Sequence, residues 1–313
     1  MALAVNNNTA AFGIWSNFST NAVKMKGAMS KLSTGVKTVA DNPSGVGISE
    51  RMRSQYRNAA SARSNVDNSI SLLQTADSWM QKINDMLGRM SELGIEAGDG
   101  TKTEGDVENI QTEFKELQTE IVRVTSKSTA AAKFNGLYLF RGGDGQAVIS
   151  GDGVGTDNIT VQIGPDSNQT VDLSLKDLQV TNTEVIGTTV DYQYNSDNAV
   201  TSSTLTNVSW SSVVDSTDMS VGVDGVVGKL SKAIDFISNA RASNGAQQNR
   251  LEHSRAGLLA YEDNLRAAES KVRDVDMARE STSFAKYQIL NQVSNAMLAQ
   301  ANQLPGQVLQ LIG

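Results

Sequence analysis

The sequence predicts a mainly α-helical protein. Both ends of the chain are expected to build a long antiparallel helical rod, or coiled-coil bundle, and the middle a small β-hairpin within a β-rich region. Apolar residues recur at alternating spacings of three and four through much of the first and last thirds of the chain, which places them on one helix face. The 313 residues include only three prolines, so long helices need not be interrupted. Strand-like alternation of apolar and polar residues occurs only in the middle.

The first segment, Met1 to Val23, contains no charged residue. An apolar stripe with coiled-coil spacing runs through it and beyond. Its members are Trp15, Phe18, Ala22, Met25, Met29, Leu32 and Val36. We expect one amphipathic helix here, followed by an irregular connector around Pro43, Gly45 and Gly47.

Helical spacing resumes from about Ile48, with a second apolar stripe that the glycines near Asp99 end. A third helix is expected from about Glu104 to Ser128. The short glycine-containing turn predicts that it folds back antiparallel on the second helix.

The pattern changes after Phe134. Ile159, Val161 and Ile163 alternate with polar residues, and Val171 and its neighbours do so again after a Gly-Pro-Asp-Ser-Asn segment. This predicts a β-hairpin near 158–176. Between Gly142 and Gly228 twelve acidic residues stand against one basic residue, so we expect a solvated, acidic middle.

Helical spacing returns near Val226 and continues to the end. The last segment, Tyr287 to Gly313, again contains no charged residue. Its apolar stripe comprises Leu290, Val293, Met297, Ala301 and Leu304. Exposed helix faces normally carry charges. Two uncharged amphipathic ends therefore predict that the ends pair with each other and that the pair packs against copies of itself.

These elements predict three regions. A terminal-helix domain comprises 1–45 with 280–313. A helical rod domain comprises 46–180 with 225–279 and includes the hairpin. A short surface excursion covers 181–224.

Composition excludes several classes of protein. The chain has no cysteine, which rules out disulfides and thiolate chemistry. No basic stripe with aromatic residues suggests nucleic-acid binding, and no apolar run suggests a membrane span. The first residues lack the features of a cleavable signal peptide. The expected protein is not an enzyme and uses no cofactor or metal.

Candidate reactive groups have simpler explanations. His253 is the only histidine and is expected to lie exposed on a helix. The glycine-aspartate pairs within Gly142–Gly145 and Gly151–Gly153 are typical of calcium repeats but are expected to form turns. Asp274 and Asp276 lie beside arginines, which favours a solvated charge cluster over a metal site.

Several motifs, taken in order, resemble bacterial flagellin, the subunit of the flagellar filament. The similarity covers roughly the first 140 and the last 85 residues. The motifs are Lys31–Gly35, Asp41–Ile48, Ser71–Ala76, Gly245–Leu251, Asp274–Glu280 and Ala296–Gln303. The family usually has a second Asp and an Ala where Asn42, Pro43 and Ser44 stand here, so a local change in the connector is expected.

The resemblance implies a structural protein that is exported as an unfolded monomer through the flagellar type III apparatus. It implies polymerisation with itself outside the cell. It also implies an export chaperone, a filament cap and hook-junction proteins as partners. Residues expected to pack between subunits are Trp15, Phe18, Met25, Met29, Leu32, Leu290, Val293, Met297, Leu304 and Leu309.

The resemblance also suggests a host partner. Arg89, Leu93 and Glu113 match positions through which many flagellins contact vertebrate Toll-like receptor 5. Two other functions remain open at this point. One is a hook–filament junction protein of the same fold, and the other is a secreted adhesin that binds through its acidic middle.

Overall fold

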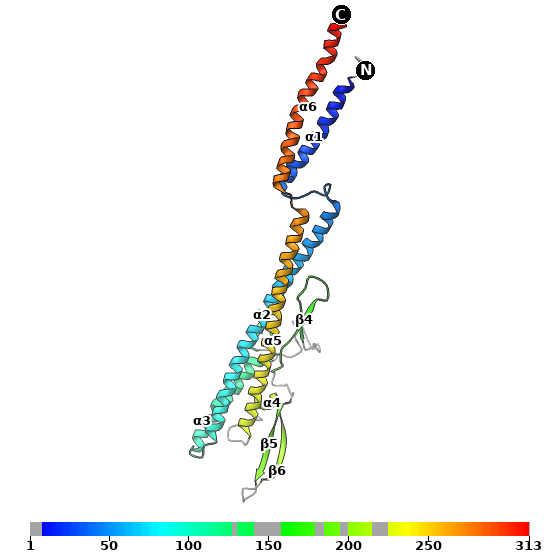
Figure 1. Ribbon diagram of the computed structural model, residues 1–313. Helices are drawn as coiled ribbons and strands as arrows, with labels where there is room; N and C mark the ends of the chain where they lie inside the picture. The colour runs from blue at the N-terminus through cyan, green and yellow to red at the C-terminus, as the bar shows by residue number, and fades with distance from the viewer. Residues whose placement is uncertain are drawn as a thin grey trace. The chain divides into compact units, whose positions relative to one another are not determined.

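The computed structural model describes residues 8–126, 130–140, 158–178, 185–194, 200–214 and 225–312. It confirms the mainly α-helical fold with small antiparallel strand pairs (Figure 1). The helices are α1 (Thr9–Thr34), α2 (Pro43–Ala97), α3 (Glu104–Thr125), α4 (Trp210–Val214), α5 (Val226–Arg273) and α6 (Met277–Ile312). The strands are β1 (Lys133–Phe134), β2 (Leu137–Tyr138), β3 (Asn158–Gln162), β4 (Thr170–Ser174), β5 (Val185–Tyr194) and β6 (Val200–Ser209).

The chain forms two compact units. The first unit comprises Met1–Arg57 with Glu262–Gly313, and the second comprises Asn58–Tyr261. The unit boundaries therefore fall within α2 and α5, whereas the sequence predicts breaks after residues 45 and 279. Each of these helices is continuous across the boundary. The boundaries therefore do not coincide with a break in secondary structure, which is the only kind of break that the sequence pattern can indicate.

Local capping defines α1. The side chain of Asn8 accepts a hydrogen bond from the backbone N–H of Ala11 at 2.9 Å, which satisfies a donor that the first helical turn leaves free. At the other end Gly35 adopts a left-handed conformation with φ of 71°, and its N–H donates to the carbonyl of Lys31. This is the usual glycine ending of a helix.

The irregular connector expected up to Gly47 is shorter than predicted, because α2 begins at Pro43. Asn42 provides the reason. Its side-chain oxygen accepts from the N–H of Gly45 at 3.0 Å and caps the helix, while proline suits the first helical position. A Cβ on Gly45 would lie 2.6 Å from Cγ of Asn42. The glycine thus leaves room for the capping side chain.

Helices α2, α3 and α5 provide most of the core of the second unit. Lys102 and Glu96 form an ion pair beside the turn that joins α2 to α3, and Arg89 of α2 reaches Glu113 of α3. These contacts establish the antiparallel return that the sequence predicts. Large side chains that are fully buried along these three helices include Leu73, Met80, Ile83, Leu87, Met90, Leu93, Phe114, Ile121, Leu230, Ile237 and Leu251.

The predicted β3–β4 hairpin is confirmed, with Val161 paired to Val171 in antiparallel register. Side-chain amides hold it on the helices. Gln247 of α5 accepts from the N–H of Ser174 and donates to its carbonyl, both at 3.0 Å. Asn58 and Asn65 of α2 each donate to a backbone carbonyl of the hairpin region at 3.3 Å.

The expected surface excursion at 181–224 needs a correction. Strands β5 and β6 form an antiparallel pair within it, but Val208 and the short helix α4 belong to the core. Trp210 is fully buried, and its indole N–H donates to the carbonyl of Leu178 at 2.6 Å. Val213 and Val214 are also fully buried. These apolar residues follow a segment rich in threonine and serine, so composition alone predicts that they lie in a solvated region.

Candidate functional site

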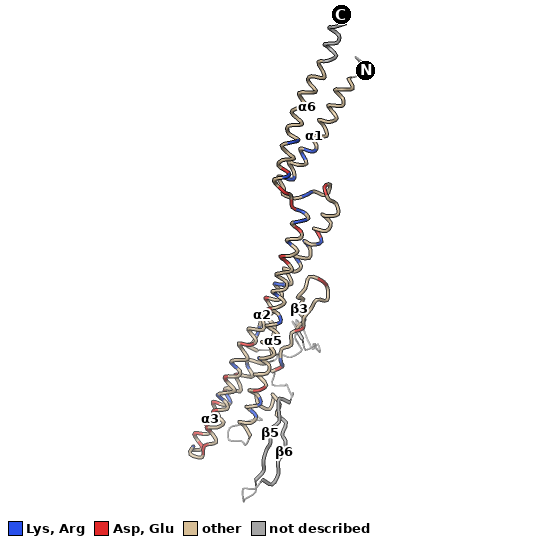
Figure 2. Tube along the Cα trace, in the orientation of Figure 1, with Lys and Arg blue, Asp and Glu red and all other residues tan. Residues whose placement is uncertain are grey.

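The candidate site lies in the first unit, where α1 and α6 run side by side and the two chain ends lie at the same end of the pair (Figure 1). Asn8 donates to the carbonyl of Ala301 at 2.8 Å, which joins the beginning of one helix to the later part of the other. Toward the chain ends, the described parts of both helices carry no charged residue (Figure 2). The predicted pairing of the two ends is thus present within one subunit.

The face of α1 toward its partner repeats with a spacing of three and four. Its buried or half-buried residues are Ala11, Ile14, Phe18, Asn21, Met25, Ala28 and Leu32. The corresponding residues of α6 are Phe284, Tyr287, Asn291, Ser294, Leu298 and Ala301. Many of these residues are small or polar, and the two backbones can therefore approach closely.

Asn291 is a buried polar residue in this interface and indicates how the two helices are aligned. It is 8% exposed, and its side-chain N–H donates to the sulfur of Met25 at 3.4 Å. A buried polar residue in a helix pair favours one register over the alternatives. The sequence-based stripe does not include Asn291, because an asparagine breaks an apolar pattern.

Each of the two helices also has exposed apolar side chains that its partner does not cover. We call these residues of the two helices together the outer apolar face. They are Phe12, Trp15, Val23 and Met29 of α1 and Ile289, Val293 and Met297 of α6. The predicted stripes thus contain residues of both faces: Phe18, Met25, Leu32 and Leu290 are half-buried, whereas Trp15, Met29, Val293 and Met297 are exposed. The side chains of Leu304 and Leu309 lie outside the described residues.

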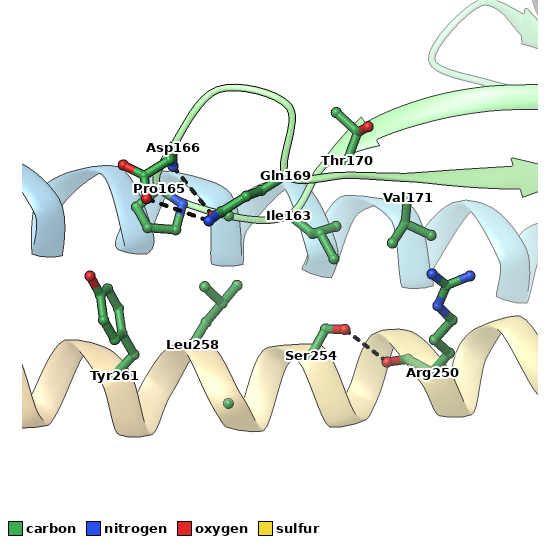
Figure 3. Close-up of a pocket in the computed structure, with 12 residues that line it drawn as sticks. Ile163, Pro165, Asp166, Gln169, Thr170, Val171, Arg250, Ser254, Leu258 and Tyr261 are labelled. Atoms are coloured by element: carbon green, nitrogen blue, oxygen red, sulfur yellow. Dashed lines mark hydrogen bonds between the residues drawn. The ribbon is translucent and has the colours of Figure 1, made fainter.

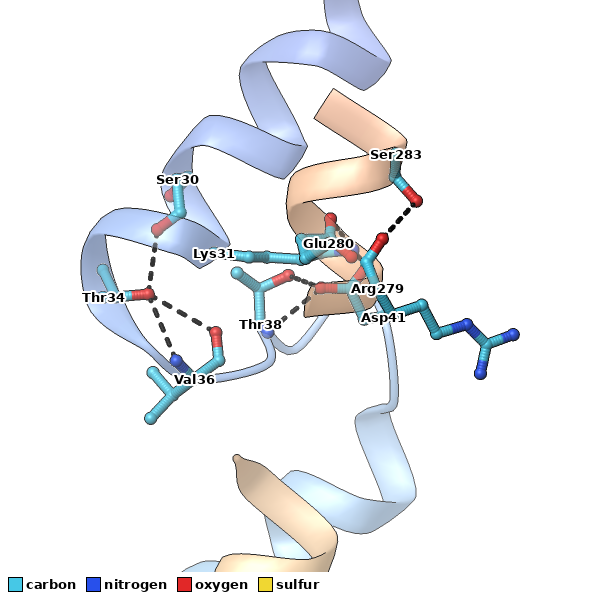
Figure 4. A network of polar contacts seen from close by, with 9 residues as sticks. All are labelled: Ser30, Lys31, Thr34, Val36, Thr38, Asp41, Arg279, Glu280 and Ser283. Atoms are coloured by element: carbon cyan, nitrogen blue, oxygen red, sulfur yellow. Dashed lines mark hydrogen bonds and ion pairs between the residues drawn. The ribbon is translucent and has the colours of Figure 1, made fainter. Parts of the chain in front are cut away.

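Charged groups gather where the helix pair meets its connectors (Figure 4). Lys31 of α1 lies 2.8 Å from Asp41 and 3.6 Å from Glu280 of α6. Thr38 donates to Asp41 from both its N–H and its hydroxyl. Hydrogen bonds from Lys31 and Thr38 lower the pKa of Asp41 to about 2, and Asp41 raises the pKa of Lys31.

The two connectors also bind each other. Val36 and Asp274 form an antiparallel bridge. The N–H of Lys37 donates to the carbonyl of Arg273 at 2.8 Å, and the N–H of Val275 donates to the carbonyl of Gly35 at 3.0 Å. Both chain segments that lead into the helix pair are therefore fixed to each other at its base.

The second unit contains a groove of about 540 Å³ between the β3–β4 loop and α5 (Figure 3). Ile163, Val171 and Leu258 line it with Arg250 and Asp166. The carboxylate of Asp166 accepts from the Gln169 amide at 3.4 Å. Ser254 also lines the groove, and its hydroxyl donates to the backbone carbonyl of Arg250 at 3.0 Å.

The other candidate groups are placed as follows. His253 is exposed on α5. Within the described ranges no group of three metal-ligating side chains forms, and none of the helices there could cross a membrane. The glycine-aspartate pairs of 142–153 lie outside the described residues.

Of the three residues expected to contact the receptor, Arg89 and Glu113 are exposed and Leu93 is buried. Arg89 binds Glu113 through two hydrogen bonds of 2.7 and 3.2 Å, and both side chains are about half exposed. Glu113 has a lowered pKa because Arg89 donates to it. Leu93 is only 1% exposed. It faces the core and shares no surface with Arg89, which corrects its predicted position.

The fold and the site define a helical protein whose chain ends pair and leave an apolar face open to further packing. Comparison with known sequences identifies the family. Residues 5–144 match the bacterial flagellin N-terminal helical region and residues 227–312 the C-terminal helical region. The chain belongs to the bacterial flagellin family.

Full-length relatives agree with this assignment. The chain is 35% identical over 315 residues to a flagellin of Bacillus subtilis, covering 99% of this chain and 100% of that protein. It is 35% identical over 312 residues to a flagellin of Halalkalibacterium halodurans, with the same coverage. It is 33% identical over 314 residues to the flagellar filament 33 kDa core protein of Treponema phagedenis, also with 99% and 100% coverage.

Proposed function

We propose that this chain is a structural subunit of the bacterial flagellar filament and polymerises through its outer apolar face. The observation that carries the proposal is the exposure of Trp15, Val293 and Met297 on the uncharged parts of the two helices, together with exposed Met29. A helix pair that remained in water would gain nothing from this apolar surface, whereas burial between copies contributes about 25 cal/mol per Å². Membership of a structural protein family supports the same role.

Assembly of this kind places the protein outside the cell, in the filament. We infer that the subunit leaves the cell unfolded by the flagellar export route and meets an export chaperone, a filament cap and hook-junction proteins. Flagellin relatives support the filament location. These partners follow from the family relationship and would be tested by co-purification of each with the full chain.

Removal of Tyr287–Gly313 tests the polymerisation proposal. Because this segment lies in the first unit, the second unit should keep its helical circular dichroism and cooperative unfolding. Seeded filament growth should be lost, while the full chain elongates under the same conditions. Filaments from the truncated chain would overturn the proposal. A full chain that binds filament ends but does not elongate would indicate a junction protein instead.

We also propose that the exposed pair Arg89–Glu113 contacts vertebrate Toll-like receptor 5. Both side chains are accessible in the subunit, and an arginine–carboxylate pair offers directional hydrogen bonds to a partner. Leu93 has no part in this contact, because it is buried.

The receptor test compares two ion pairs of similar exposure. Arg89→Ala and Glu113→Ala should each weaken binding to the receptor ectodomain by about 1–3 kcal/mol if the residues are anchors. Arg123→Ala is the matched control, since Arg123 pairs with Glu120 on the surface of α3. Equal effects of all three variants, or no binding by the unmodified subunit, would refute the contact.

A further inference from the structure

The sulfur chemistry of this chain is confined to methionine. The sequence contains ten methionines and no cysteine. A thioether is therefore the only side-chain group here that two-electron oxidants convert reversibly.

The most exposed and the most buried of the described methionines lie in different units. In the first unit Met29, Met277 and Met297 are 56%, 49% and 54% exposed. In the second unit Met80 and Met90 are 2% and 0% exposed. Among the described methionines these three are the exposed ones, and all of them lie in the helices that the polymerisation proposal involves.

Two of the three belong to the outer apolar face. Met297 follows Ile289 and Val293 at intervals of four residues, so the three side chains share one side of α6. Met29 follows exposed Trp15 by fourteen residues, about four turns, so these two side chains share one side of α1. Met277 is also exposed, but it precedes Ile289 by twelve residues and points to another side of the helix.

We propose that Met29 of α1 and Met297 of α6 are each an oxidation-sensitive modification site, and that their oxidation controls assembly. A hydroperoxide transfers one oxygen atom to the thioether sulfur. The sulfur supplies two electrons, the O–O bond breaks, and hydrogen peroxide leaves as water. The sulfoxide is polar, and its burial in an apolar interface without a hydrogen-bond donor is unfavourable.

The direction of control follows from access. In the unassembled subunit both methionines are about half exposed. In a filament that buries the outer apolar face they are covered, so an assembled subunit resists oxidation while a free one is blocked. This inference rests on the proposed function, because it requires that the face be buried between copies.

The test uses the full chain. Purified subunit is treated with dilute hydrogen peroxide, the oxidised methionines are located by peptide mass spectrometry, and the critical concentration for seeded growth is measured. We expect Met29, Met277 and Met297 to oxidise before Met80 and Met90, and the critical concentration to rise on the order of tenfold or more. Treatment with methionine sulfoxide reductases should restore growth, which separates sulfoxide formation from other damage.

Variants identify the residues responsible. Leucine has nearly the volume of methionine and no sulfur, so the critical concentration of Met29→Leu combined with Met297→Leu should be the same before and after peroxide treatment, whatever its value in the untreated variant. Met277→Leu is the control for an exposed methionine outside the face and should stay sensitive. Unchanged growth of the oxidised full chain, or continued sensitivity of the double variant, would overturn the inference. Failure of the untreated chain to polymerise would refute the proposed function instead.

Discussion

Met297→Lys is the sharpest test of the outer apolar face. The Met297 side chain is 54% exposed in the subunit, so a lysine there can extend into water and should leave the subunit folded. If copies bury this face in the filament, the same lysine must lose its water. The substitution should therefore leave the folding of the subunit unchanged and destabilise the filament.

The magnitude follows from area and charge. The exposed half of the side chain is on the order of 80–100 Å², so its loss removes about 2 kcal/mol of apolar burial per subunit at ~25 cal/mol per Å². An unpaired buried charge costs about 2–4 kcal/mol more. No acidic residue occurs in Met1–Val23 or Tyr287–Gly313, so these segments offer the lysine no counter-ion. A total above about 4 kcal/mol corresponds to a rise of roughly 1,000-fold in critical concentration.

The assay is seeded growth over a range of subunit concentrations, followed by sedimentation and electron microscopy. Met297→Leu is the matched control and should polymerise like the unmodified chain, because it keeps the volume and the apolar character. Thermal unfolding of each monomer checks that folding is unaffected. Growth of the lysine variant at the normal critical concentration would show that Met297 is not buried between copies and would refute the reasoning.

Three further predictions concern the subunit itself. Gly45→Ala should stabilise α2 by about 0.5–1 kcal/mol only when Asn42 is also replaced by alanine, because the new Cβ otherwise displaces the capping side chain. Urea unfolding of the two single variants and the double variant measures this effect. An equal gain from Gly45→Ala with Asn42 present and with Asn42 replaced would contradict it. Trp210→Ala should lower the free energy of unfolding by about 3–5 kcal/mol in a urea titration, since the side chain is fully buried, and a loss below about 1 kcal/mol would show that the core does not depend on it. Asp41 has a folded pKa of about 2, below its ordinary 3.8, so its contribution is present above pH 4 and is lost as the pH falls toward 2. Because the carboxylate is partly exposed, we expect about 1 kcal/mol, and Asp41→Asn should abolish this part of the acid dependence in unfolding measured between pH 2 and pH 5.

The sequence by itself determines the helical character of both ends, the hairpin and the family. Spacing of three and four predicts a helix wherever it persists, because a helix repeats every 3.6 residues. The alternation around Val161 and Val171 predicts the hairpin for the equivalent reason in strands. The absence of charge in the terminal segments is also a property of sequence alone, and it indicates assembly however the two helices pack.

Tertiary structure decides which side of each helix is used. In α1 and α6 several sets of residues fit the same spacing, and apolar character alone selects a stripe that mixes the inner face with the outer one. The inner face instead takes Ala28 and Asn291, because close approach of two helices favours small side chains and a defined polar contact. Leu93 and Trp210 show the same limit in the second unit, where burial depends on contacts with residues that are distant in the sequence. Periodicity fixes the existence of a helix face, but only the packing of one element against another decides whether that face meets the core, the partner helix or another copy.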